Sequence, residues 1–188
     1  MDVIALAQSG FGEAVAPLGT AMTEHQLERL WRIAEVPLLC FDGDSAGQKA
    51  AIRAAHRALP MLAPGRSLAF MTLPVGQDPD DVVRTAGPAA FEALIGKAEP
   101  LVERLWAHEL AAEPLDTPEQ RAGLKRRLSD LAGSIADPAA KSEYHTAIAG
   151  AAAARPVRAG PHRQCRSDGP SWLAARQRIW RRGRRRRS

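Results

Sequence analysis

Two aspartates, Asp42 and Asp44, flank a single glycine directly after an apolar run at residues 36–41. Carboxylate oxygens are the ligands that Mg²⁺ prefers, and two or three suffice because phosphates and water complete the coordination shell. Gly43 carries no side chain and permits a tight turn between the two acids. We therefore predict an acidic site that holds a divalent metal, magnesium or manganese, for phosphate chemistry. The ordinary alternative is a strand-end residue followed by a turn.

A second acidic cluster, Asp78, Asp80 and Asp81, follows another apolar run at residues 67–73. By itself this cluster indicates only a helix start, because Asp at the N-cap, Pro at the first helical position and acids in the first turn are typical of one. Together the two clusters favour a shared site. The predicted metal ligands are Asp42, Asp44, Asp78 and Asp80.

The two apolar runs are expected to be the strands that position these acids. Residues 36–41 have the continuous apolar pattern of a strand covered on both faces in a parallel sheet, so Cys40 is expected to be a buried, inert side chain. Ser45 and Gln48 predict a capping box for a helix that runs to Leu59. The carboxyl ends of parallel strands meet at one edge, where open α/β sheets bind ligands.

Helix alternates with strand along the first half of the chain, which indicates an α/β fold with a parallel sheet. We predict a helix at residues 1–7, a short strand at residues 13–19 and a helix capped by Thr23 with Gln26. Because open α/β units usually begin with a strand, a first strand is expected before the opening helix.

Charge and composition divide the chain into three segments: an α/β domain at residues 1–95, a helical subdomain at residues 96–150 and a basic tail at residues 151–188. The first 150 residues carry 14 Lys and Arg against 20 Asp and Glu, whereas the tail carries 12 Arg and one acid. The tail is expected to be disordered. Its Arg-rich composition indicates either non-specific nucleic-acid binding or, as we favour, a frameshifted reading of a GC-rich gene.

The sequence predicts a cytoplasmic protein. No apolar run approaches the length of a membrane span, and the first residues lack the pattern of a secretory signal. The two cysteines give neither a disulfide framework nor zinc-ligand spacing.

Four motifs in this order resemble the TOPRIM domain of bacterial replicative DNA primases. They are MDVIALA at residues 1–7, APLGT at 16–20, CFDGDSAG at 40–47 and LPVGQDPDD at 73–81. The resemblance covers residues 1–95, and the helical stretch to residue 148 is similar to the next subdomain of the family. It implies DNA-templated synthesis of RNA primers at a TOPRIM acidic site.

The resemblance also implies roles for particular residues. Asp42, Asp44, Asp78 and Asp80 match the acids that bind Mg²⁺ or Mn²⁺ in the family, and Asp2 matches an acid beside the active site. The implied partners are a DNA template, nucleoside triphosphates and, in the full-length family, the replicative helicase. The family's first strand ends in a glutamate that this chain lacks, as it lacks the zinc-binding domain, so the chain alone is expected to be incomplete for primer synthesis.

Other readings of the acidic turn remain open. A TOPRIM topoisomerase or nuclease is one, although a topoisomerase needs a tyrosine nucleophile and the only tyrosine is Tyr144. A phosphatase of the haloacid-dehalogenase type is another, although Ala46 replaces its usual Thr or Val. A non-catalytic remnant that binds nucleic acid through its tail is a third.

One basic stripe is a candidate nucleic-acid contact. Lys49, Arg53 and Arg57 recur every four residues on the helix that follows the first acidic turn, so they share one face. The ordinary alternative is a solvated helix face.

Overall fold

The computed structural model describes residues 2–17 and 22–154. These residues all lie within one compact unit. None of the described helices is both long enough and apolar enough to cross a membrane. The predicted disordered tail lies outside the described residues, apart from the last turn of the final helix.

A three-stranded sheet in the order β1-β2-β3 forms the centre of the α/β part. Strands β1 (Leu38–Phe41) and β2 (Ala69–Thr72) run parallel, with Leu38 opposite Ala69 and Phe41 opposite Thr72. This confirms the predicted pair of parallel strands. The third strand, β3 (Glu99–Pro100), pairs antiparallel with β2 and was not predicted. It is only two residues long, too short to leave a periodic pattern in the sequence.

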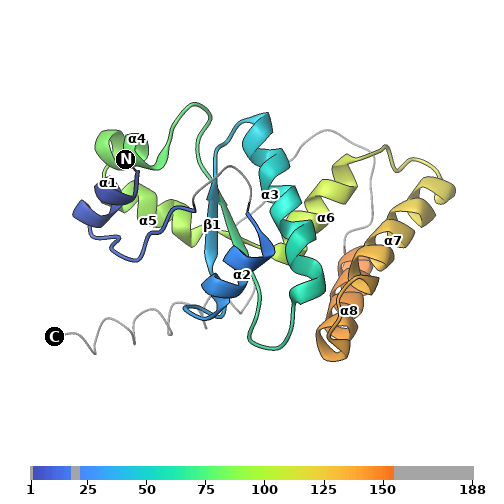
Figure 1. Cartoon of the computed structure of the whole chain (residues 1–188). Helices are drawn as coiled ribbons and strands as arrows, with labels where there is room; N and C mark the ends of the chain where they lie inside the picture. Colours follow the sequence, from blue (N-terminus) through green and yellow to red (C-terminus); the bar gives the residue numbers. More distant parts are fainter. Residues whose placement is uncertain (1, 18–21, 155–188) are drawn as a thin grey trace. The chain divides into compact units, whose positions relative to one another are not determined.

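Helices cover both faces of the sheet, as the continuous apolar run had predicted (Figure 1). Leu39 and Phe70 pack with α2 (Glu24–Trp31) and α3 (Ser45–Ala58) on one face. On the other face, Met71 packs with α1 (Asp2–Gln8), α4 (Pro79–Ala86) and α5 (Pro88–Gly96). The assignment follows from strand geometry, since alternate side chains point to opposite faces.

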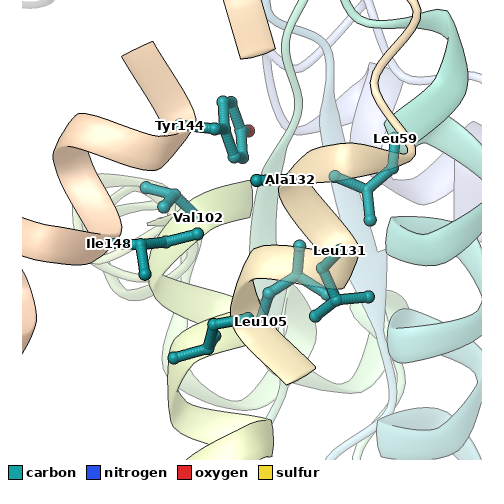
Figure 2. A pocket seen from close by; sticks show the side chains of 8 residues that line it. Leu59, Val102, Leu105, Leu131, Ala132, Tyr144 and Ile148 are labelled. Carbon is teal, nitrogen blue, oxygen red and sulfur yellow. The ribbon is translucent and has the colours of Figure 1, made fainter. Parts of the chain in front are cut away.

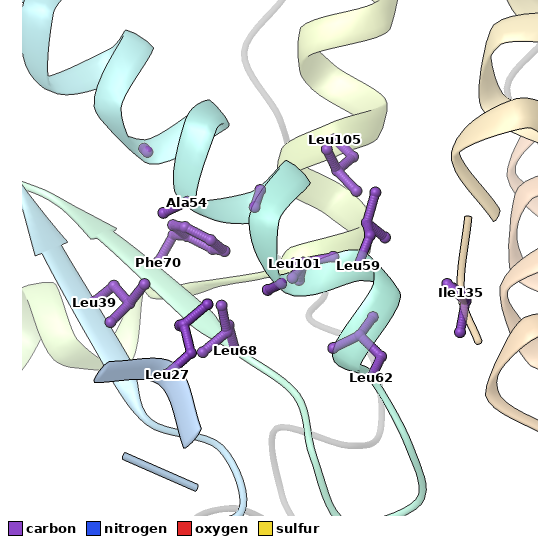
Figure 3. Close-up of a cluster of buried hydrophobic side chains, with 13 residues drawn as sticks. Leu27, Leu39, Ala54, Leu59, Leu62, Leu68, Phe70, Leu101, Leu105 and Ile135 are labelled. Atoms are coloured by element: carbon purple, nitrogen blue, oxygen red, sulfur yellow. The ribbon is translucent and has the colours of Figure 1, made fainter. Parts of the chain in front are cut away.

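The remaining helices extend the first of these two cores. A 3₁₀ turn, η1 (Leu59–Met61), ends α3, and after β3 the chain forms α6 (Leu101–Ala111), α7 (Pro118–Gly133) and α8 (Pro138–Ala154). Leu101 and Leu105 of α6 and Ile135 after α7 belong to the same buried cluster as Leu39 and Phe70 (Figure 3). The α/β part and the helical segment therefore share one hydrophobic core.

Two local predictions about the chain before and within β1 were wrong. Residues 13–17 form a turn and irregular backbone rather than a strand, and residues 18 and 19 lie outside the described part. Cys40 is exposed, not buried. The physical reason is that, among the described residues, β1 is bonded only to β2 and lies at an edge of the sheet. An apolar run reveals a strand's covered faces but not how many neighbours it has.

Candidate functional site

The chain leaves β1 and β2 at the same edge of the sheet, β1 directly into the first acidic turn and β2 into residues 73–77, which lead to the second acidic cluster. Asp42 follows β1 directly, and the Leu73 amide after β2 donates to the carbonyl oxygen of Phe41 at 3.0 Å. The two strands are therefore still in register where they end. The parallel topology predicted this juxtaposition of the two strand ends.

Gly43 brings the acidic turn after β1 into direct backbone contact with residues 73–75, the segment that leads toward the second acidic cluster. A Cβ atom at this position would overlap the Leu73 carbonyl oxygen and would lie 2.9 Å from the Val75 amide nitrogen. Real Cβ atoms are not found so close to backbone, so only glycine fits. The sequence indicated a tight turn at Gly43, whereas the structure shows that the glycine is needed for a close approach between two segments 30 residues apart.

Gly47 has a similar role that the sequence analysis missed. A Cβ atom there would overlap the Asp42 carbonyl oxygen and lie 2.9 Å from its carbonyl carbon. The first turn of α3 is thus packed against the backbone of Asp42. The available signal was a glycine inside the first turn of a predicted helix, since such a position usually has a packing reason.

Asp44 is the N-cap of α3. Its Oδ1 accepts a hydrogen bond from the Gly47 amide at 2.7 Å, and its backbone is extended, with φ −80° and ψ 175°. The predicted capping box of Ser45 and Gln48 was therefore wrong by one residue, because Asp44 satisfies the free amide instead. The Gln48 side chain points to another partner, Arg104.

Asp78 is the N-cap of α4, as the sequence pattern predicted. Its Oδ1 accepts from the Asp81 amide at 2.7 Å, with Pro79 in the first turn. Asp81 forms an ion pair with Arg84. Asp80 lies in the same first turn and is partly exposed. Two of the three acids in this cluster therefore have structural contacts, and each keeps a second carboxylate oxygen.

Among residues 2–17 and 22–154, no group of three or more His, Cys, Asp or Glu side chains is arranged to hold a metal ion. The four predicted ligands therefore do not form a closed cage. The chemistry of the donor set still fits magnesium or manganese, since Mg²⁺ is commonly bound by one or two carboxylates together with waters and substrate phosphates. Asp42 and Asp44 are exposed and available for such partial coordination.

Asp2 lies within electrostatic range of the same strand end. Although Cys40 as a residue is exposed, the pKa of its thiol is raised to about 12, first by the burial of the sulfur among neighbouring atoms and then by the negative charges of Asp42 and Asp2. Both carboxylates therefore act on one thiol at the end of β1, although Asp2 comes from α1. A thiol with this pKa stays protonated near neutral pH and is a poor nucleophile.

The basic stripe lies on α3. Lys49, Arg53 and Arg57 are all exposed. The Arg57 guanidinium donates to the backbone carbonyl of Met22, before α2, so it also holds α2 against α3. Lys49 and Arg53 are the two members of the stripe closer to the acidic turn.

Tyr144, the tyrosine that a topoisomerase reading would need, is on α8. Burial raises its pKa to about 12, opposed by a hydrogen bond with the Ser67 side chain. It lines a small apolar pocket with Val102, Ala132 and Ile148 (Figure 2). A half-buried phenol packed among apolar side chains is part of the contact between helices and is not placed as a nucleophile.

Comparisons with known proteins agree with this architecture. Residues 1–83 match the Toprim-like family. A DNA primase of Rickettsia felis is 44% identical over 144 residues, which are 77% of this chain and 24% of that protein.

Solved structures give the same result for the fold. The catalytic core of the Escherichia coli primase superposes with a TM-score of 0.73 at 39% identity, covering 79% of this chain and 48% of that one. The catalytic domain of a DnaG primase bound to single-stranded DNA superposes with a TM-score of 0.73 at 38% identity, with the same coverage. The chain thus spans about a quarter of the length of the curated relatives and about half of the solved primase chains.

Proposed function

The chain belongs to the DnaG-type bacterial DNA primases, of whose TOPRIM region it carries part, and on this premise we propose that its acidic turns bind the divalent metal used in nucleotidyl transfer. The proposed setting is the synthesis of RNA primers on a DNA template from nucleoside triphosphates. The proposed location of this activity is the cytoplasm, and the proposed protein partner is the replicative helicase.

The observation that carries the proposal is the contact at Gly43. It fixes the acidic turn after β1 against the segment 73–75, which leads to the second acidic cluster. Because Gly43 leaves no room for a Cβ atom, the backbone of the acidic turn packs directly against residues 73–75, which supports a fixed position for Asp42 and Asp44 at this end of the sheet. Such pre-organisation is what a metal site needs from a protein.

Asp42 and Asp44 would supply the first carboxylates, with Asp78 and Asp80 from the second turn and Asp2 as a neighbouring charge. A bound Mg²⁺ or Mn²⁺ stabilises charge on the attacking and leaving oxygens during phosphoryl transfer. The protein's own part is to hold the carboxylates at the end of the sheet and, through the first turn of α3, to offer backbone N–H groups toward an anion.

Nucleic acid is the proposed macromolecular partner. A related primase catalytic domain has been solved with single-stranded DNA. The exposed Lys49 and Arg53, one and two turns into α3, are the proposed contacts to nucleic-acid phosphates near the acidic turn. Arg57 is the weakest candidate of the stripe, because its guanidinium also binds the Met22 carbonyl.

Metal binding is the direct test, because the chain spans only part of its relatives and primer synthesis involves more than these residues. The variants are Asp42→Asn and Asp44→Asn, separately and combined. Asn keeps the N-cap of α3 at position 44 while removing the charge. The affinity for Mn²⁺, measured by electron paramagnetic resonance, is expected to fall about tenfold or more in the double variant.

Asp116→Asn, an exposed carboxylate before α7, is the matched control and is expected to bind Mn²⁺ like the parent chain. Circular dichroism should show the same helix content in all variants. Equal Mn²⁺ affinity in the parent chain and in the double variant would overturn the proposed metal site.

A further inference from the structure

Arg104 is a buried cation on the apolar side of α6. The residue is 8% exposed, and it lies between Leu101 and Leu105, both of which belong to the main core. A buried guanidinium is costly unless its donors are satisfied. Its position therefore calls for a specific set of partners.

The guanidinium of Arg104 has three partners on three other elements. It donates to the side-chain carbonyl of Gln48 on α3, to the Thr72 hydroxyl at 3.4 Å at the end of β2, and to the Glu99 carboxylate at 3.3 Å on β3. The planar fork of arginine suits such a divided set of acceptors better than a lysine ammonium.

Two of these partners lie next to the acidic turn, one on each side. The backbone amide of Gln48, whose side chain binds Arg104, donates to the backbone carbonyl of Asp44. Thr72 precedes Leu73, whose carbonyl oxygen meets Gly43. Arg104 is thus connected through Gln48 to the start of α3 and through Thr72 to residues 73–75, which contact Gly43.

From this arrangement we propose that Arg104 is a positioning residue for the metal site: it ties α6 to the acidic turn after β1 and to the segment 73–75, and it holds the two together. The inference rests on the proposed metal-binding function and extends it to the helical segment. Arg104 does not itself meet phosphate or metal, because its side chain is only 10% exposed. It acts through Gln48 and Thr72.

The test compares Arg104→Met and Arg104→Lys with the parent chain. In Arg104→Met the Mn²⁺ affinity is expected to fall about tenfold, at the low end of the effect of outer-shell partners on metal sites. Simple electrostatics predicts the opposite sign, since loss of a cation near carboxylates should strengthen binding of a divalent cation. Arg104→Lys keeps the charge but not the fork, so an intermediate affinity is expected.

A second readout does not depend on metal. The Gly47 amide is held by Asp44, and its hydrogen-exchange rate is expected to rise in Arg104→Met. Gln48→Met should reproduce both effects, and the double variant should be no worse than either single change, because coupled residues are not additive. Gln48→Met also carries the test if Arg104→Met does not fold.

Arg127→Met is the matched control. Arg127 forms ion pairs with Glu109, at 2.7 Å, and with Glu113, so its loss perturbs the packing of α6 on α7 and not the acidic turns. Its thermal stability should fall while its Mn²⁺ affinity stays at the parent value. Parent-like affinity and Gly47 exchange in Arg104→Met and Gln48→Met would overturn the positioning role. If the parent chain binds no Mn²⁺, the proposed metal site fails, and Gly47 exchange alone decides the role of Arg104.

Discussion

At the scale of single residues, the candidate site depends on two glycines as much as on its carboxylates. Gly43 and Gly47 have no side chain at positions where a Cβ atom would meet the backbone of residues 73–75 and of Asp42 respectively. The acids Asp42 and Asp44 could be exchanged for Asn with little change of shape. The glycines cannot be exchanged without moving one segment of backbone away from another.

We predict that Gly43→Ala lowers the free energy of unfolding by roughly 1–3 kcal/mol, the usual cost of forcing an added methyl group into packed structure. Urea denaturation followed by circular dichroism measures the change. Gly96→Ala is the control, because a Cβ atom at Gly96 meets nothing within 4 Å. That substitution should be neutral or slightly stabilising, since it restricts the unfolded chain. Equal effects of the two substitutions would contradict the close approach at Gly43.

The raised pKa of Tyr144 predicts that the protein loses stability at alkaline pH. Its pKa is raised from 10.0 to about 12, so the folded state holds the proton more tightly than the unfolded state. Stability is therefore retained below pH 10 and falls as the pH rises from about 10 toward 12, with a slope of up to about 1.4 kcal/mol per pH unit. Cys40 titrates over an overlapping range, so Cys40→Ala is the reference chain.

The measurement is the free energy of unfolding between pH 9 and pH 12 in Cys40→Ala with and without Tyr144→Phe. The phenylalanine variant should show a flatter dependence on pH by about one proton. Parallel curves for the two chains would show that Tyr144 does not contribute.

At the scale of elements, the two helices that follow the acidic turns begin in the same way. Both α3 and α4 have an aspartate N-cap whose Oδ1 accepts from the amide three residues later, at 2.7 Å in each case. The same side chains are proposed metal ligands. Capping uses one oxygen of each carboxylate and leaves the other, so the two roles are compatible.

Substitutions of Asp44 should therefore affect the stability of the fold and the binding of metal independently. Asp44→Ala is expected to lower the free energy of unfolding by about 1 kcal/mol, because an N-cap is lost. Asp44→Asn should stay within a few tenths of a kcal/mol of the parent chain. Both substitutions remove the negative charge and should weaken Mn²⁺ binding to a similar degree. A stability loss in Asp44→Asn as large as in Asp44→Ala would contradict the capping role of the side chain.

At the scale of the whole molecule, the main core joins parts of the chain that the sequence analysis divides at residues 95 and 96. Leu101 is fully buried and packs in one cluster with Leu39, Phe70 and Ile135 (Figure 3). The network around Arg104 crosses the same boundary. The division into two domains remains a prediction, and unfolding can test it.

We predict that Leu101→Ala lowers the free energy of unfolding by about 2–5 kcal/mol and that α3 and α7 lose protection together. Hydrogen exchange of amides in the two helices, followed through denaturation, measures both transitions. Coincident midpoints indicate one cooperative unit. Separate midpoints, with α3 unaffected by the substitution, would favour two independently folding domains.

Much of the fold could be predicted because its signals are local. Thr23 with Gln26 and Asp78 with Pro79 mark helix starts within four residues, and the structure places an N-cap at both. The parallel pairing of β1 and β2 followed from the alternation of strand and helix, since parallel strands need a crossover. At the site, the sequence located the two parallel strand ends that meet at one edge, whereas the grouping of the four aspartates remains a prediction.

The sequence by itself determined which residues form the parallel strands, where the helices that follow them begin and which acids come after each strand along the chain. Only the tertiary structure decided the exposure of Cys40, the antiparallel β3, the contact of Gly43 with residues 73–75 and the partners of Arg104. These features depend on segments about 30 to 60 residues apart. Helix caps and apolar periodicity are set by neighbours along the chain, whereas a close approach between distant backbones is fixed only when the whole core packs.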